Sequence, residues 1–114
     1  MFQVYNFTTA SGRQPVKEFI NKQDRLSREK IYTVIKYLKK YGFHLGTDYL
    51  RRMSGTKNLW ELRAKYESKQ YRVFMAKGNG QEVVMLHAIV KKTGKTPIKD
   101  IQLAEKRLKQ LENS

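Results

Sequence analysis

The sequence predicts an α+β fold: a small antiparallel or mixed sheet with two N-terminal helices and one C-terminal helix. Two observations support this prediction. Apolar residues recur at helical spacing before residue 42 and again after residue 97, whereas apolar and polar residues alternate between Leu50 and residue 77, as they do in strands. The expected order is a strand, two helices, a meander of three or four strands and a helix.

The N-terminal part of the chain predicts the first strand and two helices. Residues 2–7 alternate and suggest the strand. Pro15 opens a short helix, because the first helical position needs no backbone donor. Ser27 is the expected N-cap of a second helix, and Gly42 is its expected end. The second helix has apolar residues at the i, i+3, i+4, i+7 positions Ile31, Val34, Ile35 and Leu38.

The middle of the chain predicts two strands with one polar face each. Alternation over residues 59–66 places Glu61, Arg63 and Lys65 on one side. Alternation over residues 70–77 does the same for Gln70 and Arg72. The sequence Gly78-Asn79-Gly80 then predicts a tight hairpin, because Gly and Asn tolerate positive φ.

The C-terminal part predicts a buried strand and the last helix. Residues 82–92 form a nearly continuous apolar run, which is typical of a central strand covered on both faces. Thr96 is the expected N-cap of the helix, with Pro97 in its first turn. One apolar stripe follows the helix, made of Ile98, Ile101, Ala104, Leu108 and Leu111.

Composition indicates a folded protein that binds polyanions. The 114 residues are enough for one domain, so we expect residues 1–114 to form a single one. Twenty-four Lys and Arg against ten Asp and Glu give a net charge of +14, spread along the whole chain. Such a surface favours nucleic acid, RNA ahead of DNA, or an acidic protein, over charge that only solubilises.

Composition also excludes some kinds of site and bears on the compartment. The chain has no cysteine, which rules out disulfides, thiolate zinc sites and a cysteine nucleophile. Its N-terminus lacks a secretory pattern, and no apolar run is long enough to cross a bilayer. We therefore expect a cytoplasmic protein with no membrane partner.

Basic side chains of three predicted strands share one side of the sheet. If the strands are antiparallel neighbours, Arg63, Arg72, His87 and Lys91 converge near the turn that contains Lys95. Arginine presents a planar fork of donors that suits phosphate oxygens. We call this expected arrangement a cationic cup.

Several members of the cup also have an ordinary interpretation. A lone Arg63 is most often a surface residue, and Arg72 can pair with Glu61 across the strands for about 0.2–1 kcal/mol. His87 lies in an apolar run, so a satisfied core histidine and an acid–base group near neutral pH have equal weight.

Lysines gather where the last strand ends, at Lys91, Lys92 and Lys95. A lysine held among other cations and partly desolvated has a lowered pKa and can act as a base, while its neighbours hold phosphate. The ordinary interpretation is a basic loop with no special pKa.

Three segments, taken together and in order, resemble a known family: LWELR at residues 59–63, YRVF at 71–74 and LHAIVKKTGKTP at 86–97. They look like the phage-derived, HigB-like branch of the RelE/ParE toxin superfamily, and the similarity runs along almost the whole chain. The resemblance implies a RelE-like fold.

The resemblance further implies the toxin of a type II toxin–antitoxin system, an endoribonuclease that cleaves mRNA on the ribosome. Its partner would be a helix-turn-helix antitoxin of the HigA kind, and it would reach operator DNA only through the antitoxin complex. RelE-type members use basic residues of the sheet face, with no metal or cofactor. Carried over onto matching positions, these residues are Arg63, Arg72, Lys91 and Lys92.

RNA supplies its own nucleophile, because the 2′-OH can attack the adjacent phosphate and leave a cyclic phosphate and a 5′-OH. We predict Arg63 and Arg72 as phosphate clamps, Lys91 or Lys92 as base or electrostatic stabiliser, and His87 as a candidate acid. The further predicted RNA-binding residues are Lys65, Tyr66, Gln70 and Lys95.

Two other functions remain open. A ParE-like toxin would share the fold and inhibit DNA gyrase without cutting RNA. A non-catalytic RNA- or DNA-binding module would show salt-sensitive binding and no cleavage.

Overall fold

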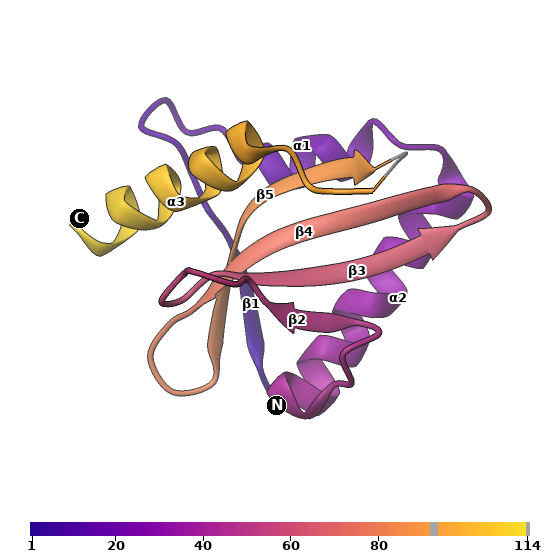
Figure 1. Cartoon of the computed structure of the whole chain (residues 1–114), viewed down its shortest axis with the longest axis horizontal. Coiled ribbons are helices and arrows are strands. Elements are labelled where there is room, and N and C mark those ends of the chain that lie inside the picture. The colour runs from indigo at the N-terminus through magenta and orange to yellow at the C-terminus, as the bar shows by residue number, and fades with distance from the viewer. Residues whose placement is uncertain (92–93, 114) are drawn as a thin grey trace.

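A computed structural model of the chain describes residues 1–91 and 94–113. The fold is α+β, as predicted, and it has a five-stranded mixed sheet with helices on both of its faces (Figure 1). The elements in chain order are β1 (Gln3–Asn6), α1 (Pro15–Asn21), α2 (Arg25–Tyr41), the 3-10 turn η1 (Gly42–His44), β2 (Leu50–Arg52), β3 (Trp60–Tyr66), β4 (Lys69–Lys77), β5 (Glu82–Lys91) and α3 (Ile98–Glu112).

The strands lie in the order β1-β5-β4-β3-β2, with β1 parallel to β5 and the other pairs antiparallel. β5 has a neighbour on each side, as its apolar run predicted, but the middle strand of the five is β4. All residues from 71 to 76 of β4 are buried, and they include the charged Arg72. Two residues connect β3 to β4, and the first, Glu67, has a φ of 54°.

The two faces of the sheet are covered unequally. α1 and α2 pack on one face and enclose the larger core, whose fully buried side chains include Ile31, Leu62 and Tyr71. On the other face, α3 packs over β5 and β4, with Ala104 against Phe74 and Leu86. In Figure 1, α3 lies away from β2 and from the end of β3. No helix that the structure describes packs over that part of the second face.

The starts of two helices differ from the prediction. The N-cap of α2 is Asp24, because its carboxylate accepts hydrogen bonds from Ser27 N (2.9 Å) and Ser27 Oγ (3.0 Å). Ser27 is the third residue of the helix and is fully buried. α3 begins one residue later than expected, with Pro97 as its N-cap. The Thr96 hydroxyl donates to Glu61 instead of capping the helix.

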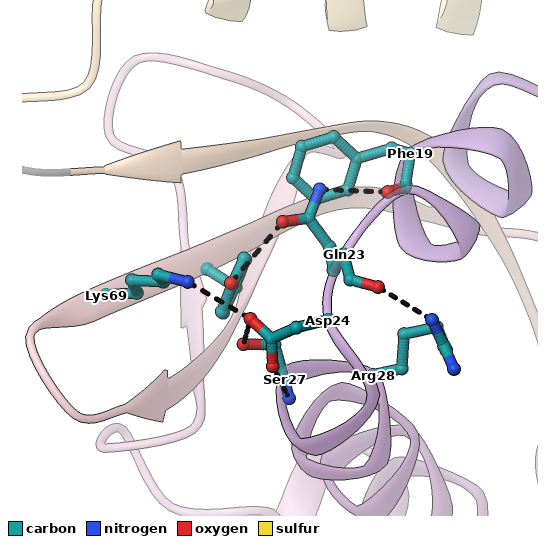
Figure 2. A network of polar contacts seen from close by, with 7 residues as sticks. Phe19, Gln23, Asp24, Ser27, Arg28 and Lys69 are labelled. Carbon is teal, nitrogen blue, oxygen red and sulfur yellow. Dashed lines mark hydrogen bonds and ion pairs between the residues drawn. The ribbon is translucent and has the colours of Figure 1, made fainter.

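Asp24 also ties the β3–β4 hairpin to the junction of α1 and α2 (Figure 2). Lys69 Nζ, at the start of β4, donates to Asp24 Oδ2 at 3.1 Å. The Ser27 backbone N–H and then Lys69 lower the pKa of Asp24 to about 2, so its carboxylate stays charged. Gln23 accepts from Tyr71 Oη through its side chain and from Arg28 through its backbone carbonyl. These contacts fix the end of the sheet that α3 leaves open.

α2 ends at Gly42 as predicted, and the position requires glycine for two reasons. Its φ of 59° with ψ of −138° lies in a region that other residues rarely adopt. A Cβ at this position would also overlap the ring of Phe2. Of the helices described, none is both long enough and apolar enough to cross a membrane.

We expect Gly42→Ala to lower the free energy of unfolding by about 2 kcal/mol, because it adds backbone strain and displaces Phe2. Gly46→Ala is the matched control, since its φ is not positive and nothing lies within 4 Å of the added Cβ. Urea denaturation should show a change below about 0.5 kcal/mol for the control. Equal effects of both variants would contradict this explanation of the helix end.

Candidate nucleic-acid interface

Strand register brings basic side chains together on the open part of the second face. Arg63 pairs directly with Arg72, Lys65 with Gln70, and Gln70 in turn with Lys91. Directly paired residues of antiparallel strands share a face. We call this surface the basic face and define it by Arg51, Glu61, Arg63, Lys65, Gln70, Arg72 and Lys91.

Glu61 lies at the centre of the basic face and is only 6% exposed. Its Oε1 lies 3.4 Å from Arg63 Nε and 3.3 Å from Arg72 Nε. Its Oε2 accepts a hydrogen bond from Thr96 Oγ1 at 3.4 Å. One carboxylate therefore holds two arginines from neighbouring strands and the segment that leads into α3.

Arg72 is the most buried cation of the basic face, at 3% exposure. Its Nη2 donates to Gln70 Oε1 at 2.8 Å, while its Nε is close to Glu61 without making a hydrogen bond. Burial is the main cause of its lowered pKa; Glu61 opposes the shift, and Arg63 and Arg51 add to it. The predicted role of Arg72 as a phosphate clamp does not fit this burial. Arg72 and the more exposed Arg63 share the Glu61 carboxylate as their ion-pair partner.

Lys91 completes the basic face from β5. Burial first, and then the guanidinium of Arg72, lower the pKa of Lys91 from its ordinary value. A lowered pKa increases the fraction of neutral amine that can accept a proton. Lys95 is exposed and borders a hollow that Lys91 also lines. Lys92 lies outside the described residues.

His87 shares the face with Lys91 but is covered by α3. Its Nε2 is 2.8 Å from Asp100 Oδ1, and its Nδ1 is 3.3 Å from Arg107 Nη1. Arginine can only donate, so Nδ1 accepts and Nε2 carries the proton that Asp100 accepts. The ring also stacks on Phe74. Both ring nitrogens thus bind α3, and this geometry does not favour the predicted acid role.

Strand alternation places Tyr66 on the opposite face, with Leu62 and Ala64, so the structure does not bring it to the basic face. Tyr71 is fully buried in the core. Arg51, which pairs with Glu61 from β2, was not among the predicted residues. The alternation that begins at the buried Leu50 was a signal that could have found it.

A surface hollow of about 540 Å³ continues the basic face around the outer edge of β3. Its lining includes Arg63, Lys65 and Arg72 from the sheet, Lys30 from α2, and Tyr49 from the loop before β2. Two acidic residues, Asp48 and Glu67, also border it. The hollow is a second place, next to the arginines, where part of a ligand can lie.

Most of the chain matches a known protein family. A family model described as phage derived protein Gp49-like (DUF891) matches residues 18–109, from α1 through most of α3. The match includes every strand of the basic face. No curated protein matches the chain.

We expect Glu61→Gln to destabilise the fold by about 3 kcal/mol, because it leaves Arg72 buried without a counter-charge next to another arginine. Glu18→Gln is the matched control, since it breaks the more exposed Arg13–Glu18 pair and should cost less than about 1 kcal/mol. Urea denaturation of both variants tests this. A similar loss of unfolding free energy in both variants would mean that Glu61 does not offset the positive charge of the two arginines.

Proposed function

The chain belongs to the Gp49-like family of phage-derived proteins, which is part of the RelE/HigB-type toxin group, and from this premise we propose that it is a HigB-like toxin. As such it acts as an endoribonuclease on ribosome-bound mRNA in the cytoplasm, and residues 1–114 form its single toxin domain. Membership of a toxin-like family implies an antitoxin partner. We propose a helix-turn-helix protein of the HigA kind, through which operator DNA is reached.

The observation that carries this proposal is the pair of arginines facing each other across β3 and β4, on a part of the sheet that none of the described helices packs over. Like charges directly opposite are destabilising. The chain nevertheless places Arg63 and Arg72 there and adds Arg51 and Lys91 around them. A local feature that opposes stability is expected at functional sites. A phosphate group is the ligand that relieves this repulsion.

RNA cleavage by its own 2′-OH needs groups that this face supplies. The oxygen of the 2′-OH attacks the adjacent phosphorus, the bond to the 5′-oxygen breaks, and a 2′,3′-cyclic phosphate and a 5′-OH result. Arg63, with 27% of its side chain exposed, and Lys91 hold the phosphate and stabilise its added negative charge. Lys91, or Lys92 next to it in sequence, takes the proton of the 2′-OH, and a water molecule protonates the leaving 5′-oxygen. No metal ion is required for this step.

Other predicted residues support the substrate or the site. Lys65 and Lys95 are exposed at its margins and bind neighbouring phosphates. Gln70 and Arg72 position Arg63 and Glu61 through their mutual hydrogen bond and ion pairs. His87 holds α3 on the sheet through Asp100.

We expect induced expression of the wild type to arrest growth and to produce cuts in translated mRNA at codon positions, seen by primer extension. Arg63→Gln and Lys91→Gln should each reduce cutting by on the order of 100-fold, because each removes a charge that stabilises the transition state. The cut ends should carry a 5′-OH, which accepts label from a polynucleotide kinase without prior dephosphorylation.

Arg52→Gln is the matched control, because Arg52 lies next to Arg51 on the same strand and pairs with Trp60, on the other face. It should cut as the wild type does. Growth arrest with intact mRNA would favour a ParE-like gyrase inhibitor, and no arrest would favour a non-catalytic binding module. Both results would contradict the proposal, as would ends that carry a 5′-phosphate.

A further inference from the structure

We propose that Tyr49 is a stacking platform for one RNA base, and that the hollow it lines holds the nucleotide next to the phosphate bound by Arg63 and Lys91. Lys30 binds the phosphate on the far side of that nucleotide. This inference rests on the proposed function and extends it, because it names a subsite for single-stranded RNA that continues from the basic face toward α2.

Tyr49 is fixed beside the basic face by its backbone and its ring. The Arg63 backbone N–H donates to Tyr49 O at 2.7 Å, and Tyr49 N donates to Gly46 O at 2.9 Å. The ring packs edge-on with Tyr37 of α2, with centroids 5.8 Å apart and an interplanar angle of 79°. Even so, 37% of Tyr49 is exposed. An aromatic side chain held in place at the surface loses little further entropy when a base stacks on it.

The hollow has the size and position for a nucleotide. Its volume of about 540 Å³ falls within the range of small-molecule sites. It opens where β3 loses its outer neighbour, since β2 pairs with β3 only as far as Leu62 among the described residues. An RNA strand that crosses Arg63 can therefore turn over the edge of the sheet toward α2.

Charge within the hollow separates phosphate positions from a base position. Arg63 and Lys65 lie on its sheet side and Lys30 on its helix side, with Tyr49 also in the lining. Asp48 lies next to Tyr49 in sequence and repels a phosphate there. A carboxylate accepts hydrogen bonds from base amino groups. The base therefore belongs on Tyr49, and the phosphates belong on either side of it.

The test uses the 114-residue chain and a six-nucleotide fluorescent RNA whose 2′-hydroxyls are methylated, so that it binds without being cut. Tyr49→Ala should weaken binding about tenfold, the effect of losing one base stack, while Tyr49→Phe should bind within about twofold of the wild type. Tyr32→Ala is the matched control, because Tyr32 is 43% exposed on α2 and does not line the hollow. Thermal unfolding of each variant confirms that the fold is retained.

Lys30 is tested by the salt dependence of the same binding. Lys30→Gln should reduce the slope of log affinity against log salt concentration by about 0.7, the value for one phosphate contact with a single strand. Lys36→Gln, on the exposed side of the same helix, should leave the slope unchanged. An unchanged slope in Lys30→Gln would overturn the phosphate contact.

Removing a base from the RNA separates stacking from an indirect effect. An abasic residue placed at the stacked position should weaken binding by the wild type about tenfold and have no further effect on Tyr49→Ala. If the abasic residue weakens binding by Tyr49→Ala as much as it weakens binding by the wild type, at every position of the RNA, the stacking inference is wrong. If Tyr49→Ala binds normally while Arg63→Gln fails to cut, the inference fails and the proposed function stands. If the wild type neither binds nor cuts RNA, both fail.

Discussion

Arg63 and Arg72 face each other on adjacent antiparallel strands, and the repulsion between them is the constraint on which the rest of the site depends. Glu61 reduces the repulsion by reaching both guanidinium groups from within β3. This carboxylate is one charge against several, so the face stays positive after every internal pair has formed. A buried arginine behind a more exposed one directs that remaining charge outward, toward a phosphate.

Because the helices cover the two faces of the sheet unequally, the basic side chains lie on an open part of one face. α1 and α2 enclose one face completely enough to supply the main core, so the other face does not have to be buried throughout. α3 is tied over β5 by His87 and Asp100 and stops short of β2 and the end of β3. At that open end, the bond from Lys69 to Asp24 holds the hairpin on the helices. The basic face is therefore an open surface on a rigid support.

Periodicity alone predicted the order of the elements and placed the basic residues of β3, β4 and β5 on one side of the sheet, because alternation along a strand fixes the side that each residue takes; it did not predict Arg51 of β2. It did not predict burial, which depends on strand order, and so it treated Arg72 as a residue free to bind a ligand. The Ser27 N-cap was wrong because Asp24 offers a better acceptor three residues earlier. No pattern in the sequence indicated Tyr49, because a backbone hydrogen bond from Arg63 N–H to Tyr49 O brings it to the site.

Nuclear magnetic resonance of the arginine Nε–H groups during titration with a methylated, uncleavable RNA oligonucleotide tests whether phosphate binds at Arg63. We expect the signals of Arg63 and Arg72 to shift together with one dissociation constant, Arg63 through contact and Arg72 through the field of the bound phosphate. The signal of Arg52, on the opposite face, should stay in place. Equal shifts at Arg52, or no shift at Arg63, would contradict a phosphate site on the open face of this sheet.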